Sequence, residues 1–291
     1  MYNVVASNIL KRFEYEKEKL YLLVDNAYIE IAEWIREQHT NTEIVSISSC
    51  TPENIKEIFD LPSSAVVLLL AEPDTYIKYK LFKYFHYNEG EPKIENTISR
   101  VLIFPKEAIC RIFSEVLNKD IFVRDDIIAK MKNEQKYKIT TTQGTDLVFE
   151  SRYWIPLDFE VCTAPIEESV NGVIVVDGAF FFKKIEDKII FQIENGKIHS
   201  ITASSPEGEQ LVAEYKNMTA RDMQNPVNMQ LAEIGIGFCN GAMISDCFME
   251  AETIVNTCHF CFGNNICYGG KNESEFHGAS ILIRNPIFEQ I

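Results

Sequence analysis

Apolar runs of strand length alternate with helix-patterned segments over the first part of the chain. The runs are Leu20–Val24, Glu43–Ile47, Ala65–Leu70 and Val101–Ile103. Between the first two, Ile29, Ile31, Ala32 and Ile35 fall at helical spacing. This alternation is typical of βαβ units around a parallel sheet, so we expect a Rossmann-like α/β domain over residues 1–132. No glycine-rich phosphate loop follows any of these runs, which gives no support to a nucleotide site there.

Helical segments are expected over 104–117 and 125–131. From about residue 136 the pattern changes to short segments in which apolar and polar residues alternate, separated by Gly and Asn-Gly. The clearest is a hairpin in which Lys188–Ile193 and Lys197–Ala203 flank a turn at Asn195-Gly196. A helix is expected from Pro206 to Asn217. Residues 133–291 are therefore predicted to form a second, β-rich α+β domain.

Size and charge narrow the class of protein. The chain has 291 residues, enough for two domains of ordinary size. It carries 28 Lys and Arg against 43 Asp and Glu, a formal net charge of -15. Such a charge repels phosphate backbones and anionic lipid surfaces, so neither nucleic acid nor a membrane is an expected partner.

The location expected for the chain is the cytoplasm. Its longest purely apolar run, Ala65–Ala71, is far shorter than the roughly 20 residues that span a bilayer, and the N-terminus lacks the order of a signal peptide. The eight cysteines are then expected to be reduced thiols. Cys258 and Cys261 lack the second pair that a zinc ribbon needs, and their apolar strand favours buried thiols.

Two stretches place carboxylates and imidazoles inside apolar strand surroundings, where such groups are costly unless hydrogen-bonded or bound to a metal. The first contains Asp158-Phe159-Glu160-Val161-Cys162-Thr163-Ala164-Pro165. The second contains Glu233-Ile-Gly-Ile-Gly, then Glu250-Ala-Glu252, then Thr257-Cys-His259-Phe-Cys-Phe-Gly263 and Gly269-Gly-Lys-Asn272-Glu-Ser274-Glu-Phe-His277. Several such groups in one domain indicate a site.

In this order the motifs resemble the aminopeptidase T and aminopeptidase S family of dinuclear metallopeptidases, over about residues 136–284. The resemblance implies that Glu160, Glu233, His259 and His277 bind one or two divalent ions, from zinc, manganese, cobalt and iron. It also implies a homodimer. The family motif ends in His-x-Asp, whereas this chain has His277-Gly278-Ala279. The site is then expected to hold one ion, to hold its ions weakly, or to recruit Glu273, Glu275 or Asp246.

Other residues receive supporting roles. Tyr268 is expected to orient the scissile carbonyl, and Glu252 to support the ligands from behind. Arg152, Tyr153 and Trp154, beside Glu160 in sequence, are candidates for contact with substrate. Glu250 is expected to lie exposed on a helix.

Three functions remain open. The first is a metal-dependent aminopeptidase-like hydrolase acting on a peptide or small amide, in which Glu160 takes part in catalysis. The second is a mononuclear non-haem iron(II) oxygenase acting on a small aromatic or amino-acid-derived substrate, because the same scaffold resembles 2,5-dihydroxypyridine dioxygenases. The third, suggested by Ala279, is a catalytically inactive homologue.

Overall fold

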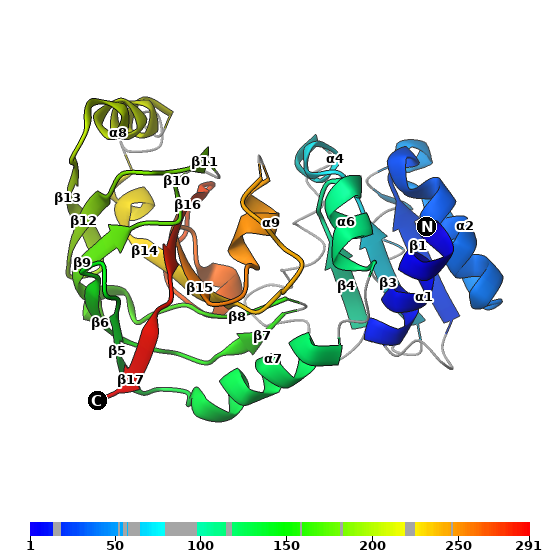
Figure 1. Ribbon diagram of the computed structural model, residues 1–291, viewed down its shortest axis with the longest axis horizontal. Helices are drawn as coiled ribbons and strands as arrows, with labels where there is room; N and C mark the ends of the chain where they lie inside the picture. Colours follow the sequence, from blue (N-terminus) through cyan, green and yellow to red (C-terminus); the bar gives the residue numbers. More distant parts are fainter. Residues whose placement is uncertain are drawn as a thin grey trace. The chain divides into compact units, whose positions relative to one another are not determined.

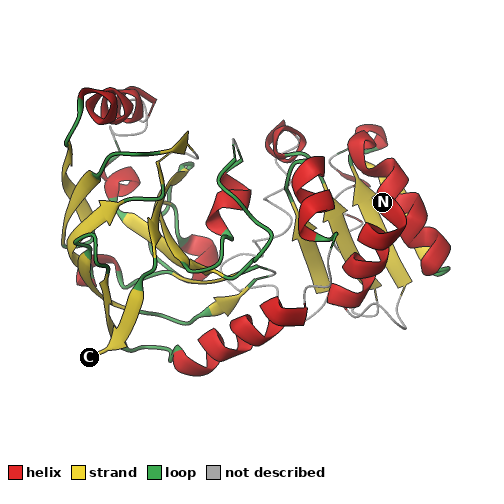
Figure 2. Cartoon of the chain, viewed as in Figure 1, coloured by secondary structure: helices red, strands yellow, loops and turns green. Residues whose placement is uncertain are grey.

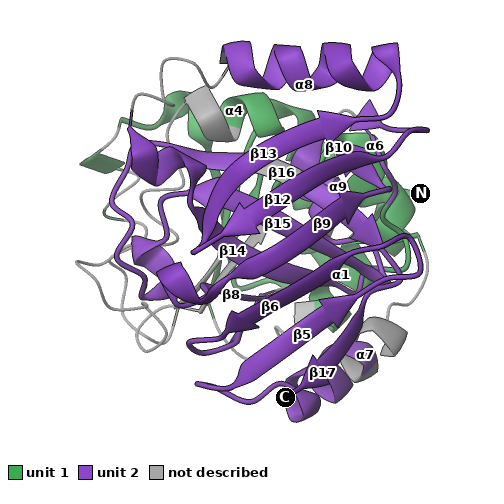
Figure 3. Ribbon diagram, turned by 90° about the vertical axis from the view of Figure 1, so that its left-hand side faces the viewer, with its two compact units in different colours: residues 1–121, 240–242 green, residues 122–239, 243–291 purple. Residues whose placement is uncertain are grey.

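The computed structural model contains both helices and sheets, as the sequence predicts for an α/β protein (Figure 2). It describes residues 1–13, 19–51, 53, 54, 57, 65–78, 98–114, 118–157, 159–180, 183–218, 225–245 and 247–291. The chain divides into two compact units, one of residues 1–121 with 240–242 and one of residues 122–239 with 243–291 (Figure 3). None of the helices that the structure describes combines the length and the apolar character needed to cross a bilayer.

The first unit is built on a parallel sheet in the order β2-β1-β3-β4 (Figure 1). Its elements are α1 (Tyr2–Phe13), β1 (Lys19–Val24), α2 (Ile29–Gln38), β2 (Thr42–Ser46), β3 (Ala65–Leu70), α4 (Pro73–Lys78), β4 (Ile98–Leu102) and α6 (Lys106–Ile112). The four apolar runs of the sequence are thus the four strands. Leu22, Leu23 and Val24 of β1 are fully buried, as expected for a strand covered on both faces.

Helix α1 was not expected from the sequence. Val5, Ala6 and Ile9, one face of this helix, are fully buried, and the Asn8 side-chain amide donates to the Phe113 carbonyl at 2.8 Å. Helix α6 ends at Ile112. The helix expected over 104–117 therefore starts two residues later, at Lys106, and Phe113 and Ser114 no longer belong to it; residues 115–117 lie outside the described part of the chain. Helix α7 (Asn118–Lys130) includes most of the segment expected at 125–131.

The second unit contains two antiparallel sheets. The six-stranded sheet runs β13-β12-β9-β6-β5-β17 and the seven-stranded sheet runs β11-β10-β16-β15-β14-β8-β7. The strands are β5 (Lys136–Thr140), β6 (Asp146–Glu150), β7 (Ile155–Pro156), β8 (Glu160–Thr163), β9 (Asn171–Val176), β10 (Ala179–Phe180), β11 (Lys183–Lys184), β12 (Ile189–Glu194), β13 (Lys197–Ala203), β14 (Leu231–Gly237), β15 (Thr257–Gly263), β16 (His277–Arg284) and β17 (Ile287–Gln290), with helices α8 (Pro206–Met218) and α9 (Phe248–Glu252). The predicted Asn-Gly hairpin is β12–β13, and Asn195 and Gly196 both have positive φ.

The core of this unit is aromatic. Phe262 of β15 stacks on Phe191 of β12 at 5.9 Å between ring centroids, so side chains of the two sheets meet there. Phe191 also packs against Phe180 and Tyr215 of α8. Because neighbouring residues of a strand point to opposite faces, the side chains of His259 and Cys261 leave this core and lie on the other face of β15.

Candidate metal centre

Three central strands place acidic and imidazole groups on one face of the seven-stranded sheet. Gly235 of β14 lies between Cys162 of β8 and His259 of β15 in the strand register. Directly opposite residues share a face, so Cys162 and His259 point to the same side, together with Glu160 two residues earlier on β8. Glu233 is paired with Cys261 across β14 and β15. Glu160, Glu233 and His259, which the sequence predicts as ligands, thus come from three neighbouring strands of one sheet.

Glu233 is the centre of the group. Its Oε1 lies 3.6 Å from His259 Nε2, and its Oε2 lies 3.0 Å from His277 Nε2. Glu160 Oε2 lies 3.6 Å from His259 Nε2 on the other side. The structure therefore brings together all four residues that the resemblance implies as ligands. The Glu233 and His259 side chains are 4% and 1% exposed, whereas that of His277 is 32% exposed and gives the group an outlet to solvent.

Both imidazoles are held by backbone carbonyls. His259 Nδ1 lies 3.2 Å from the Glu252 carbonyl, and His277 Nδ1 lies 2.6 Å from the Asn264 carbonyl. Since a carbonyl oxygen only accepts, each Nδ1 carries a proton and donates it. Each Nε2 is thereby aimed at Glu233, in the orientation that outer hydrogen bonds commonly impose on metal-binding histidines.

Steric crowding explains why glycine stands at positions 235 and 237, in the Ile-Gly-Ile-Gly segment after Glu233. A Cβ at Gly235 would lie 2.0 Å from His259 Cε1, so the imidazole occupies the space of a side chain there. A Cβ at Gly237 would lie 2.3 Å from the Ile254 carbonyl oxygen, where the chain leaving α9 crosses the sheet. The two glycines let the histidine ring and the α9 turn approach β14 closely.

Burial and charge oppose each other in the group. Burial raises the pKa of Glu160 to about 8, although the neighbouring imidazoles act to lower it. The pKa of Glu233 is lowered because hydrogen bonds from His259 and His277 outweigh its burial. Burial alone would lower the pKa of His259, but the surrounding carboxylates raise it to about 10. The carboxylates thus demand a positive charge at His259 Nε2, which a proton or a cation satisfies.

The donor set fits a divalent cation. The ligand atoms of Glu160, Glu252 and His259 lie within 4.8 Å of one another, and so do those of Glu233, His259 and Cys261. Glu160 Oε2 is buried and has no hydrogen-bond partner among the described residues. An orphaned carboxylate oxygen in a buried group is costly unless a cation or proton compensates it.

Comparisons with known proteins show the fold. Solved structures share it over nearly the whole chain, among them the following two. The 2,5-dihydroxypyridine dioxygenase from Pseudomonas putida KT2440 has a TM-score of 0.68 at 15% identity, covering 99% of this chain and 92% of that one. Wild-type AmpT from Thermus thermophilus has a TM-score of 0.67 at 14% identity, covering 99% and 95%. No protein-family model matches the chain, and no curated protein matches it in sequence.

Tyr268 lies at the edge of the group. Its ring centroid is 5.9 Å from that of His277, and its side chain packs with Cys162 and Ala164. Burial raises the pKa of the Tyr268 phenol well above its usual range, so the hydroxyl remains a hydrogen-bond donor near neutral pH. The fold thus places Tyr268 beside His277, on the loop after β15.

The three residues that follow Ser151 diverge. Arg152 Nη2 forms a buried ion pair with Glu167 Oε2 at 2.6 Å, and Trp154 packs against an aromatic cluster of Tyr137, Phe149 and Phe288. Tyr153 is exposed, and its hydroxyl lies against Gly269 in the loop that follows Tyr268. Of the three, Tyr153 is the one beside the loop that carries site residues.

The Arg152–Glu167 pair supports that loop. Glu167 Oε1 accepts the Lys271 backbone N–H at 2.7 Å and the Asn265 side-chain amide at 3.3 Å. The Asn265 side chain in turn accepts the Asn272 N–H at 2.8 Å. The Gly-Gly-x-Asn segment before His277 is therefore tied to Arg152 through Glu167. This bracing role was missed at the sequence level, where nothing marks the pairing partner.

The prediction for Glu250 was wrong. Its side chain is buried, accepting the Met243 N–H at 2.9 Å and the Ser245 hydroxyl at 2.8 Å. These bonds tie Met243 and Ser245 to α9. Glu252 on the same helix meets His259 Nδ1 with its backbone carbonyl, and its carboxylate lies in the group with Glu160 and His259. Glu273 and Glu275 are exposed, and Asp246 lies outside the described residues.

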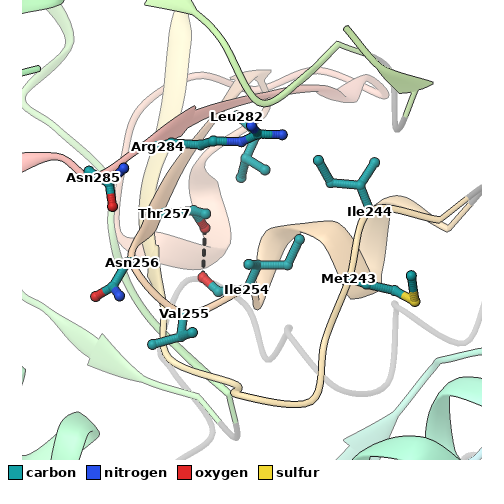
Figure 4. Close-up of a pocket in the computed structure, with 9 residues that line it drawn as sticks. All are labelled: Met243, Ile244, Ile254, Val255, Asn256, Thr257, Leu282, Arg284 and Asn285. Carbon is teal, nitrogen blue, oxygen red and sulfur yellow. Dashed lines mark hydrogen bonds between the residues drawn. The ribbon is translucent and has the colours of Figure 1, made fainter. Parts of the chain in front are cut away.

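A recess of about 330 Å³ opens on the same face of the sheet as His259. Thr257 lies two residues before His259, and Leu282 and Arg284 are opposite His259 and Thr257 in the register. Met243, Ile244 and Ile254 line its other side, and Thr257 donates to the Ile254 carbonyl (Figure 4). The recess combines apolar walls with a single cationic side chain, Arg284.

Proposed function

We propose that this chain is a metal-dependent, aminopeptidase-like hydrolase that acts on a peptide or small amide. The observation that carries the proposal is the convergence of Glu160, Glu233, His259 and His277, distant in sequence, around one buried position. The shared fold with AmpT supports it. In this proposal the first unit is Rossmann-like and the second is of the aminopeptidase T type.

Glu160, Glu233, His259 and His277 are the proposed ligands. Two carboxylates with two imidazoles form a donor set that suits zinc, manganese, cobalt or iron. A bound divalent cation would supply Lewis acidity, which polarises a carbonyl and lowers the pKa of water. The two oxygens of Glu233 face different histidines, so this carboxylate is the one placed to serve two positions.

The chain's own groups supply proton transfer and orientation. A bound cation would keep the Glu160 carboxyl ionised, and its Oε2, which has no hydrogen-bond partner among the described residues, is proposed to accept a proton as a general base. Tyr268 is proposed to donate a hydrogen bond to the substrate carbonyl. Glu252 holds His259 by its backbone carbonyl and keeps Nε2 toward the reaction centre.

The proposal also covers the substrate class and the partners of the chain. The strong negative charge disfavours nucleic acid and membrane surfaces as partners, and we propose a small molecule or a peptide as the substrate. We also propose a homodimer.

A second candidate is a non-haem iron(II) oxygenase. The observation that favours it is the shared fold with a 2,5-dihydroxypyridine dioxygenase at a TM-score of 0.68. Two histidines with one carboxylate are the usual protein ligands of such iron sites, and His259, His277 and Glu233 provide them. The substrate would be a small aromatic or amino-acid-derived compound.

One paired assay tests the two functions. The chain reconstituted with zinc or manganese is given a panel of aminoacyl amides, and the chain reconstituted with iron(II) is given dihydroxypyridines while dissolved oxygen is followed. Metal-dependent amide cleavage that Glu160→Gln abolishes supports the hydrolase. Iron-dependent oxygen consumption without cleavage supports the oxygenase. Neither activity in a metal-loaded chain indicates an inactive homologue.

A further inference from the structure

We propose that the Cys261 thiolate is a ligand of the cation and supplies the anionic donor that Ala279 does not. This inference rests on the proposed function, because it concerns the same site. It assigns a sulfur ligand that the resemblance does not imply.

The strand register places Cys261 at the position where the motif loses its carboxylate. Phe260 is paired with Ile281 and Phe262 with Gly278, so an irregularity lies between the two pairs. The backbone of Ala279 and Ser280 occupies the β16 side of that interval, opposite Cys261. A donor on β15 at residue 261 therefore stands across the strand pair from residue 279.

The side chain of Cys261 also has the right neighbours. Its Sγ belongs with Glu233 and His259 to a group whose ligand atoms lie within 4.8 Å of one another, and the residue is 3% exposed. Sγ also donates to Glu252 Oε1 at 3.6 Å. A thiol that packs only as an apolar group does not need two carboxylates near it.

Cys258 shows the contrast within the same strand. It is fully buried, and its Sγ lies 3.6 Å from the His259 carbonyl. Because Cys258 and Cys261 are three residues apart on one strand, their side chains point to opposite faces of the sheet. The two cysteines have the same chemistry and burial, but only Cys261 shares the face of Glu233. This makes Cys258 the matched control.

Cation uptake has a simple proton balance. The Sγ–H bond breaks, its electron pair is donated to the cation, and the proton passes to solvent by way of the adjacent Glu252 carboxylate. No oxidant or other reactant is needed. The chain then presents three anionic donors, Glu160, Glu233 and Cys261, beside two imidazoles.

A sulfur donor changes which metal is preferred. Thiolates favour zinc and other soft or borderline ions, whereas sites built from carboxylates and water suit magnesium and manganese. We therefore infer that the site selects zinc, cobalt or iron over manganese. Cys261→Asp should reverse this preference toward manganese.

Cobalt(II) spectroscopy tests the assignment without relying on activity. The wild-type chain and Cys258→Ser, loaded with cobalt, should show a near-ultraviolet sulfur-to-cobalt charge-transfer band, and Cys261→Ser should lack it. Zinc affinity of Cys261→Ser should fall by more than the roughly 10- to 100-fold typical of losing an outer hydrogen-bond partner. Circular dichroism of each variant checks its fold.

A measurement on the wild-type chain covers the case in which Cys261→Ser does not fold. X-ray absorption of the zinc-loaded protein should show a sulfur neighbour at about 2.3 Å. A band that survives Cys261→Ser, or that is lost in Cys162→Ser instead, overturns the assignment. Bound cobalt or zinc with no sulfur signal overturns it and leaves the proposed metal site standing. A wild-type chain that binds neither ion overturns both.

Discussion

The imidazole of His259 occupies the space in which a side chain at Gly235 would lie. A Cβ there would be 2.0 Å from Cε1 and 2.4 Å from Nε2, while Nδ1 is held by the Glu252 carbonyl. The ring is thus confined between β14 and the end of α9. Position 235 therefore controls where Nε2 points.

Gly235→Ala is expected to displace the ring and weaken metal binding by about 10- to 100-fold, as loss of ligand orientation generally does. Isothermal titration with zinc measures the change. Gly278→Ala is the control on the same sheet, because a Cβ there meets only Phe276 at 3.7 Å. Equal zinc affinities in wild type and Gly235→Ala would show that His259 does not bind the ion.

Ala279→Asp restores the carboxylate of the His-x-Asp motif. If loss of this carboxylate is the defect, the variant is expected to tighten binding of a second ion, seen as a rise in metal stoichiometry. It should also recover the zinc affinity lost in Cys261→Ser, because either residue then supplies the anionic donor. The proposal that Cys261 replaces the missing carboxylate is contradicted if Ala279→Asp leaves the metal stoichiometry unchanged and also fails to restore zinc affinity in the Cys261→Ser background.

Glu167→Gln is expected to destabilise the protein by about 3 kcal/mol at neutral pH, because it leaves the buried Arg152 guanidinium without its carboxylate. Urea unfolding measures the loss. Burial raises the pKa of Glu167, but hydrogen bonds from Arg152 and Lys271 outweigh it and lower the pKa below 4.5. A lowered folded pKa gives stability that is present above the unfolded value and is lost as pH falls through the folded value.

The difference between wild type and Glu167→Gln should therefore shrink as the pH falls below about 4.5. Exposed Glu168 provides the control, since Glu168→Gln is expected to change stability little. A loss that is the same at pH 7 and at acid pH would mean that the charge of Glu167 contributes nothing.

Much of the fold follows from local pattern. The runs that became β1 to β4 are short, largely apolar segments, and Asn195-Gly196 suits the positive φ of its turn, so neither needed tertiary information. Helix α1 was missed because its buried face is short and lies among polar residues. The burial of Glu250 was missed because its partners, the Met243 N–H and the Ser245 hydroxyl, meet it only once the turn forms.

In the candidate site, too, some residues could be predicted from the sequence and others depend on the fold. Glu160, Glu233, His259 and His277 could be proposed as ligands because the order of the motifs is a property of the sequence, and the structure brings these four residues together. The position of Cys261 depends on the register of β14, β15 and β16, and the irregularity opposite Ala279 cannot be read from residue spacing. The bond from Arg152 to Glu167 likewise joins segments whose approach is set by the fold.

Metal content tests the central claim most directly. The wild-type chain, loaded with zinc and freed of excess ion by gel filtration, is analysed by mass spectrometry beside His259→Ala, His277→Ala and the control His199→Ala, which changes an exposed residue of β13. We predict stoichiometric zinc in the wild type and the control, and none in the two site variants despite an intact fold. Wild-type zinc content in both site variants, or no zinc in the wild type, would contradict the proposed centre.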